Sequence, residues 1–399
     1  MESFGVETEE GAKNRNLYLF YQDVCSRHTL HVYAIDSSSL LMYPVTKLPR
    51  GNSCDMGCIA HGSKLYAIGG VFRDSHAQEY PRDVLVCDLS KRKGREGDQY
   101  KWKAGPALNA GKPYPMVVAV KGKIYALAGH ADYDVPVAVD PTFEFLDHRG
   151  VWHPLPEPPF YSWYSTPPGP TLLCYTVSGN IIYVLVQKPG DNEVVELLYS
   201  FNVLKKKWKE HPRGVLCGDR VGDNLSSHKW LKWADLEDGK LYLSEAYGGS
   251  CRLYAHDLIT SKKKKFADEI VSDASACEIY GGLPVSWDVQ SSYLECGCNG
   301  VPYVRLPVKL LEVLDVSKQS LVAHVGNRML LVVCAYNPPR KFPEDRRFVY
   351  TCLLKLVKVE DNICKGSCSE KWRDCAVIVK QQYHKMNRLF DDISSWSTM

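Results

Sequence analysis

The sequence predicts an all-β fold built from many short strands, and three observations support this prediction. A short phrase of one turn and one strand recurs along the chain, its copies separated by 48 to 59 residues through residue 242. Tyr, Gly and Pro are abundant, with 24, 29 and 23 copies among 399 residues, which is typical of short strands joined by many turns. Strong helix formers are not concentrated in any segment.

The recurring phrase consists of a Gly or polar turn, a basic or polar residue, and an apolar–Tyr pair that leads into an apolar run. Copies start at Asn14, Gly62, Gly122, Gly179 and Gly239, with a weaker copy at Gly326. The tyrosines are Tyr18, Tyr66, Tyr125, Tyr183 and Tyr242. A turn followed by a nearly continuous apolar run is typical of a strand buried between two neighbouring sheets. Each copy therefore predicts one buried strand.

Aromatic residues mark the strands that follow. Phe145 precedes Trp152 and Phe201 precedes Trp208, so the same aromatic–Trp pair occurs in two successive copies at the same spacing. A four-stranded sheet cannot bury both of its faces alone and needs a neighbour on each side. We therefore expect the recurring Tyr and Trp side chains to fill the space between sheets rather than to bind a ligand.

In these features the chain resembles the kelch family, whose repeat joins an apolar strand, a Gly pair, an aromatic residue and a Trp. Gly69 and Gly70 match the Gly pair, and Gly129 keeps half of it. The resemblance covers most of residues 14–380 and is strongest in the second and third copies. It implies a kelch-type β-propeller of about six four-stranded blades, with seven as the alternative. The fourth to sixth copies depart from the pattern because they lack the Gly pair.

The expected domain organisation follows from the repeat. Residues 1–13 are predicted to form a disordered tail, residues 14–380 the propeller with an irregular insertion at about 267–320, and residues 381–399 a C-terminal tail containing a short helix. Closure of the ring is expected to pair the strand near Leu17 with strands near Val377. Because the first strand is expected to begin near residue 16, we expect no F-box or BTB domain of the kind that many kelch proteins carry.

Composition narrows the classes of partner. The formal net charge is +3, so no global field favours nucleic acid, and the short run Lys262 to Lys265 is expected to be a solvated hairpin turn. The N-terminus has no apolar targeting segment, and no stretch reaches the length of a membrane helix. We expect a cytoplasmic or nuclear protein with no membrane partner, whose 15 cysteines are reduced thiols.

The expected function is a non-enzymatic interaction module that binds a protein partner through its loops. Loops leaving the Tyr-bearing strands and loops between blades are expected to open toward one face, where aromatic and Arg residues are typical binding anchors. The residues expected on this loop face are Arg73, His76, Tyr80, His130, Tyr133, Trp163, Tyr164, Trp230, Trp233, Tyr247 and Arg340.

The alternative is a small-molecule-binding or catalytic propeller of plant specialised metabolism, since some kelch propellers of plants resemble this architecture and hold iron. The nearest spacing to such an iron site is Asp140, Glu144 and His148, but ligands on one strand at this separation cannot meet on one metal. A channel site built from His76, His130 and Asp132 is a second possibility. No local catalytic motif is present, and we expect no cofactor, no metal and no catalytic residue.

Overall fold

The computed structural model describes the chain in segments. These are residues 16–23, 29–48, 53–72, 80–90, 100–129, 139–161, 171–189, 194–211, 231–232, 234–235, 240–247, 250–257, 294–296, 302–305, 320–326, 329–336, 347–360, 372–386 and 392–398. The described part is all-β, with a short 3₁₀ turn at 159–161 and no α-helix. The prediction of an all-β fold is therefore confirmed. None of the described segments forms a helix suited by length and hydropathy to crossing a membrane.

Three sheets occupy the first part of the chain. Sheet I has the order β28-β1-β2-β3 and consists of β1 (Asn16–Asp23), β2 (Thr29–Asp36), β3 (Met42–Leu48) and β28 (Asp392–Thr398). Sheet II consists in order of β5 (Gly57–His61), β6 (Lys64–Ile68), β8 (Val84–Asp88) and β9 (Trp102–Ala104). A two-stranded ribbon of β4 (Ser53–Cys54) and β7 (Val71–Phe72) accompanies it. Sheet III consists in order of β10 (Met116–Val120), β11 (Lys123–Leu127), β12 (Phe143–Leu146) and β13 (Trp152–Pro154).

Three further sheets follow. Sheet IV has the order β17-β16-β15-β14-β18, with β14 (Thr171–Ser178), β15 (Ile181–Pro189), β16 (Val194–Asn202), β17 (Lys207–Glu210) and β18 (Leu231–Lys232). Sheet V has the order β19-β20-β21-β23-β22, with β19 (Ala234–Asp235), β20 (Lys240–Tyr247), β21 (Ser250–Asp257), β22 (Leu294–Cys296) and β23 (Pro302–Arg305). Sheet VI consists in order of β24 (Ser320–Gly326), β25 (Met329–Tyr336), β26 (Arg347–Glu360) and β27 (Trp372–Met386).

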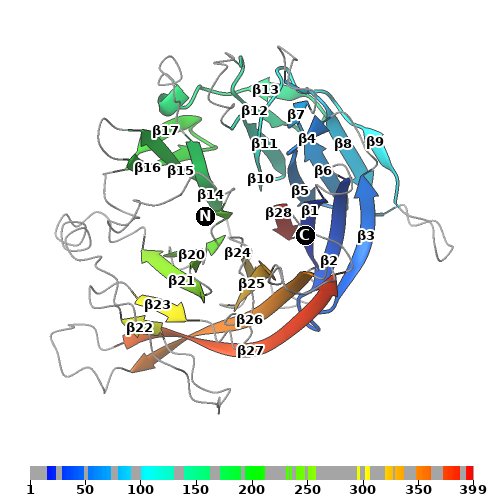
Figure 1. Ribbon diagram of the computed structural model, residues 1–399. Helices are drawn as coiled ribbons and strands as arrows, with labels where there is room; N and C mark the ends of the chain where they lie inside the picture. The colour runs from blue at the N-terminus through cyan, green and yellow to red at the C-terminus, as the bar shows by residue number, and fades with distance from the viewer. Residues whose placement is uncertain are drawn as a thin grey trace, which may run out of the picture.

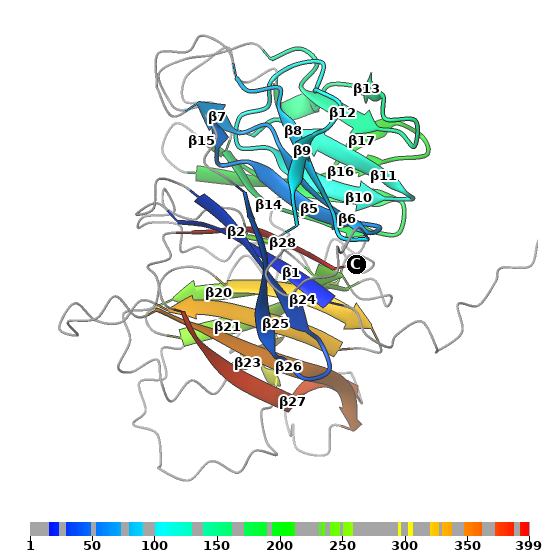
Figure 2. The ribbon, with the colours of Figure 1, turned by 90° about the vertical axis from the view of Figure 1, so that its right-hand side faces the viewer.

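The six sheets follow one another around a common centre in chain order (Figure 1). One strand of each sheet contacts the corresponding strand of the next. The successive contacts run from β28 to β5, β10, β14, β19 and β24, and β24 contacts β28 again. Figure 2 shows the same arrangement from the side, with β1 and β28 between the strands of sheet II and those of sheet VI. The innermost strands therefore make a closed circuit of contacts.

The two ends of the chain meet in sheet I. Strand β28 pairs with β1 in antiparallel register, with Leu17 opposite Thr398. The prediction that the strand near Leu17 pairs with strands near Val377 was wrong. Val377 lies on β27, opposite Lys355 of β26. Residues 381–399 were expected to form a tail with a short helix, but β27 extends to Met386 and β28 occupies 392–398. Neighbouring strands decide this conformation, since the Ser-rich β28 has little strand preference of its own.

Other expected boundaries fall largely outside the described residues. Residues 1–13 lie outside them, and so does most of the expected insertion at 267–320. The described parts of that insertion are β22 and β23, which pair with each other, while β23 also pairs with β21. Residue 320 begins β24 of the next sheet. The described fragments of the insertion thus extend sheet V.

Hydrophobic side chains fill the spaces between consecutive sheets. Sheets I and II share a core that includes Phe20 and Leu65, and sheets II and III share one that includes Ile68 and Trp152. The core between sheets III and IV is aromatic, and Phe143 meets Phe201 edge-on at 4.9 Å between ring centroids. Burying one such side chain contributes about 1.5–3 kcal/mol. The expected role of the aromatic repeat residues in packing between sheets is confirmed for Tyr125, Trp152 and Trp208.

The cysteines whose side chains are described are also part of these cores. Cys54, Cys58 and Cys87 are buried thiols, and for these three the expectation of reduced cysteines agrees with the structure. Burial raises the pKa of Cys87 to about 11, so this thiol stays protonated at neutral pH. These three side chains act as small apolar core residues.

Candidate functional site

The sheets have two different ends. At one end, tight turns join β10 to β11, β12 to β13, and β16 to β17; we call this the turn end. Lys123 and Lys206, from two of these turns in neighbouring sheets, both lie over the Phe145 ring, so the turns of sheets III and IV face the same way. The other end, which we call the loop end, carries the long connections 105–115, 128–142 and 155–170. This is the end where the sequence analysis placed the binding residues.

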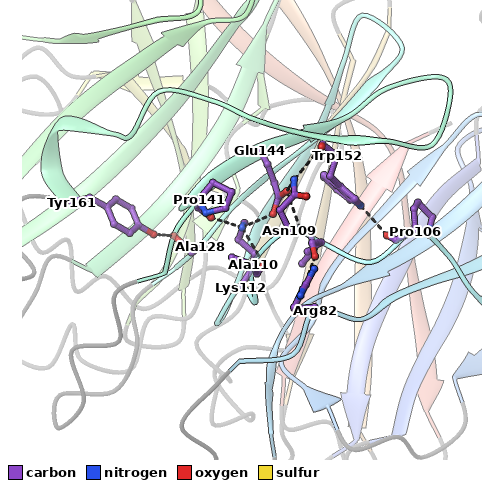
Figure 3. Close-up of polar contacts among 11 residues, drawn as sticks. Arg82, Pro106, Asn109, Ala110, Lys112, Ala128, Pro141, Glu144, Trp152 and Tyr161 are labelled. Carbon is purple, nitrogen blue, oxygen red and sulfur yellow. Dashed lines mark hydrogen bonds and ion pairs between the residues drawn. The ribbon is translucent and has the colours of Figure 1, made fainter.

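A buried ion pair joins two elements at the loop end (Figure 3). Lys112 lies on the connection between β9 and β10, and Glu144 lies on β12 between Phe143 and Phe145. Lys112 Nζ is 2.6 Å from Glu144 Oε1, and both side chains are fully buried. Successive side chains of a strand point to opposite faces, so Glu144 faces away from the aromatic core that holds Phe143 and Phe145. This places the carboxylate against the connection that carries Lys112.

Every donor of the Lys112 ammonium has an acceptor. Besides Glu144, it donates to the carbonyl oxygens of Pro141 at 2.7 Å and Ala110 at 3.2 Å. The second carboxylate oxygen of Glu144 accepts from the backbone N–H of Asn109 at 3.2 Å and from its side-chain amide at 2.7 Å. Burial lowers the pKa of Lys112, and the Glu144 carboxylate opposes that shift. A buried charge pair is tolerable when its hydrogen bonds are complete, as they are here.

The Gly pair in the preceding sheet supports the same connection. Gly69 and Gly70 follow β6 with φ values of 62° and 103°. Residues other than Gly rarely adopt such positive φ values. The N–H of Gly70 donates to the carbonyl oxygen of Lys112 at 2.8 Å. A Cβ on Gly69 would lie 2.6 Å from that same carbonyl oxygen, and one on Gly70 would clash with the Cys54 carbonyl. The pair therefore allows the backbone of residue 112 to lie directly against sheet II.

Three further hydrogen bonds hold the loop end to the sheets. Arg82 Nε donates to the carbonyl oxygen of Leu108 at 2.7 Å, and Trp152 Nε1 donates to that of Pro106 at 2.9 Å. The Tyr161 hydroxyl donates to the carbonyl oxygen of Ala128, which joins the connection after β13 to the end of β11 (Figure 3). These bonds tie the described parts of the loop-end connections to one another and to β13.

This arrangement positions backbone rather than performing chemistry. A catalytic lysine needs a free amine, but the Lys112 ammonium uses all three of its donors, and Glu144 is occupied by Lys112 and Asn109. The described side chains hold no group of three or more His, Cys, Asp or Glu residues suited to a metal ion. The network therefore holds the connections of the loop end in place.

The structure describes few of the residues predicted for the binding face. Tyr80 is half-buried at the loop end, where its carbonyl lies against Gly111. Tyr247 is the last residue of β20, and only its backbone is described. The others lie outside the described residues: Arg73, His76, His130, Tyr133, Trp163, Tyr164, Trp230, Trp233 and Arg340. The structure brings none of these together with Tyr80 among its described contacts.

The residues considered for a metal site are separated in the structure. Asp140 is exposed at the loop end, Glu144 is buried against Lys112, and His148 is exposed in the turn between β12 and β13. Asp140 and His148 thus lie at opposite ends of sheet III, and Glu144 pairs with Lys112. His76, His130 and Asp132, considered for a channel site, lie outside the described residues.

Sequence reasoning missed the ion pair. Lys112 and Glu144 are 32 residues apart, and no local motif links them. One signal was present, because a charged residue between Phe143 and Phe145 on a buried strand requires a buried partner.

Comparison with protein families gives one match. Residues 43–216, less than half of the chain, are similar to the family described as "Protein of unknown function (DUF1668)". The matched segment runs from β3 to just beyond β17 and so contains sheets II and III with the Lys112–Glu144 pair. A search of the curated proteins finds no match. The similarity thus falls on the part of the chain that holds the candidate site.

Proposed function

We propose that the protein is a kelch-type β-propeller of six blades that serves as a protein-interaction module in the cytoplasm or nucleus. Three features support the propeller: six sheets in chain order, a closed circuit of contacts between their innermost strands, and a first sheet completed by the last strand of the chain. Such closure leaves only short sheet edges exposed. The sequence resemblance to kelch repeats in the second and third copies supports the family.

The observation that carries the function is the buried network under the loop end. Ordering a flexible loop at the moment of binding costs free energy, so a surface whose loops are already fixed binds with less loss. Lys112 and Glu144 fix the connection 105–115, and Lys112 also holds the end of the 128–142 connection through Pro141. The same groups are saturated with hydrogen bonds, so they support docking better than they support chemistry. We propose that a protein partner binds at the loop end, whose connections are already fixed.

The test compares substitutions at the two ends of the sheets. Proteins captured by the intact chain from a cell extract are compared with those captured by a Trp163→Ala/Trp230→Ala variant. The matched control is Leu41→Ala/Tyr43→Ala, which removes two exposed side chains at the turn end of sheet I. Loss of a partner with the loop-end variant and its retention by the control are expected. The same partner retained by the loop-end variant and lost by the control would overturn the proposed docking surface.

A second measurement separates folding from docking. Both variants should unfold at the temperature of the intact chain, measured by circular dichroism. If the loop-end variant unfolds early, single substitutions of Tyr80 and Trp163 to Ala replace it, and direct titration of the captured partner measures the affinity. An anchor residue is expected to lower affinity by at least tenfold. Unchanged affinity in every loop-end variant would contradict the proposal.

A further inference from the structure

The turn end of sheets III and IV carries an excess of positive charge. Six cationic side chains lie on or next to its turns: Lys121, Lys123, Arg149, Lys205, Lys206 and Lys207. Among the described residues of these turns, the sole carboxylate is Asp147, which already accepts from the N–H groups of Arg149 and Val151 and pairs with His153 at 3.0 Å. Since the whole chain has a formal charge of only +3, this end is distinctly positive.

One aromatic ring draws cations from both sheets together. Lys123 Nζ lies 4.6 Å from the centroid of the Phe145 ring, and Lys206 Nζ lies 5.7 Å from it. The His153 ring stacks on the same side chain, with 5.0 Å between centroids and 25° between planes. Attraction to the ring holds both ammonium groups around this one side chain, at the boundary of sheets III and IV. The positive charge of the two sheets is thereby concentrated where an anionic surface could meet both.

Exposed apolar side chains occupy the same turns. The large hydrophobic side chains exposed among the described residues are Leu41, Tyr43, Val151 and Leu204. Val151 and Leu204 lie in the β12–β13 and β16–β17 turns, beside Arg149 and Lys205. Leu41 and Tyr43 lie at the equivalent β2–β3 turn of sheet I. Leu204 is 70% exposed, so its burial against a partner would remove much apolar surface from water.

We propose that the turn end of sheets III and IV binds an anionic membrane surface. Lys123, Lys206 and their cationic neighbours would contact lipid phosphates and carboxylates, while Val151 and Leu204 enter the interfacial layer. Peripheral binding of this kind combines positive charge with buried apolar surface and needs no spanning segment. The expectation of no membrane partner rested on the lack of such a segment and does not bear on this surface.

The exposed apolar side chains of these turns favour a lipid surface over nucleic acid as the partner. A phosphate backbone would satisfy the lysines, but it offers nothing that buries Leu204 or Val151, and nucleic-acid surfaces favour exposed aromatic side chains for stacking. Phe145, the aromatic ring of this cluster, is 8% exposed and is covered by the lysines. The exposed tips of these turns also suit an extended surface, whereas a peptide partner is usually received in a groove.

The test measures binding of the full-length protein to lipid vesicles by co-sedimentation. Vesicles of phosphatidylcholine alone are compared with vesicles containing about one-third phosphatidylserine at about 0.1 M salt. Binding to the anionic vesicles only, weakening as salt rises, is expected. Each lysine near such a surface is worth about a fivefold change, so Lys123→Gln/Lys206→Gln should weaken binding about 10- to 30-fold.

Two more variants identify what is bound. Val151→Ser/Leu204→Ser should weaken vesicle binding at least fivefold if these side chains enter the interface. Lys47→Gln/Lys103→Gln, which removes two exposed lysines of sheets I and II, should change it less than about twofold. Circular dichroism of each variant shows that it is folded. Inositol hexakisphosphate as a competitor distinguishes the lipid surface from a soluble phosphate, which would bind without any need for Val151 and Leu204.

Several results would overturn the proposal. These are failure to bind anionic vesicles, equal binding to both vesicle types, or unchanged binding by Lys123→Gln/Lys206→Gln. A single-stranded RNA that binds through the same lysines, with no dependence on Leu204 and no vesicle binding, would make this end a nucleic-acid surface instead. Because the surface lies opposite the loop end, its failure leaves the proposed protein docking untouched.

Discussion

Trp152 and Trp208 make the same hydrogen bond in two successive sheets. The indole Nε1 of Trp152 donates to the carbonyl oxygen of Pro106 at 2.9 Å, and that of Trp208 donates to the carbonyl oxygen of Pro156 at 3.0 Å. Each bond ties the outermost strand of one sheet to the connection that leads into that sheet. The Trp of the repeat thus fixes the approach to its own sheet.

Substitution of Trp152 tests this role. Trp152→Phe keeps an aromatic ring but removes the indole N–H and part of the volume from a side chain that is 5% exposed. We expect a loss of about 2–4 kcal/mol in the free energy of unfolding, from the hydrogen bond and the cavity together. Urea denaturation gives this value. Trp208→Phe, at a more exposed position, should cost less, and an equal or larger cost would contradict the assigned packing.

The Lys112–Glu144 pair calls for a double-mutant cycle. Lys112→Met leaves the Glu144 carboxylate buried without its cation and should cost about 3–5 kcal/mol. Adding Glu144→Gln removes the charge while leaving an amide that still accepts from Asn109. The double variant should therefore be more stable than the sum of the single costs predicts, by at least about 1 kcal/mol. Additive costs, measured by urea denaturation, would show that the two groups do not interact as described.

His211 is expected to make the stability of the folded protein depend on pH. Burial, with a smaller contribution from Lys209, lowers the pKa of His211, and its Nε2 lies 2.9 Å from Ser200 Oγ. The unfolded chain then binds a proton more readily than the folded one as the pH falls. Stability from this residue is complete above about pH 6.5 and declines as pH falls below that value.

The His211 prediction is measured as a difference between two proteins. Urea midpoints of the wild type and of His211→Asn are compared at pH 7.5 and 5.5. The variant should lose less stability than the wild type over this range, and His148→Asn, in an exposed turn, serves as the control. Equal losses in the wild type and His211→Asn would exclude His211 as the source of the pH dependence.

The strands and packing that the sequence predicted depend on local signals. Gly122 directly precedes β11, and Gly62 and Gly179 stand two residues before the starts of β6 and β15. A turn glycine followed by an apolar run forms a strand wherever a neighbouring sheet can cover it. The predicted packing of Tyr125 and Trp152 between sheets follows from the same local repeat. These features need no knowledge of distant parts of the chain.

Other features depend on contacts between distant residues, which one sequence does not reveal. Strand β28 is defined by pairing with β1 at the other end of the chain, and the Lys112–Glu144 pair joins a connection to a strand. One repeated local signal was overlooked. An Asp or Asn ends the third strand of sheets I, II and IV and directly follows that of sheet III, and its side chain accepts the N–H two residues later in each case. These residues are Asp36, Asp88, Asp147 and Asn202, and such side-chain turns explain the abrupt hairpins.

The proposed closure of the ring by the last strand is tested most directly by hydrogen–deuterium exchange of a truncated chain. A chain ending at residue 391 lacks β28, which pairs with β1 and contacts β5. The amides of β1 and β5 should then exchange faster than in the full chain, by a larger factor than those of β11, whose partners all lie within sheet III. Unchanged protection of β1 and β5 in the truncated chain would contradict the closed arrangement.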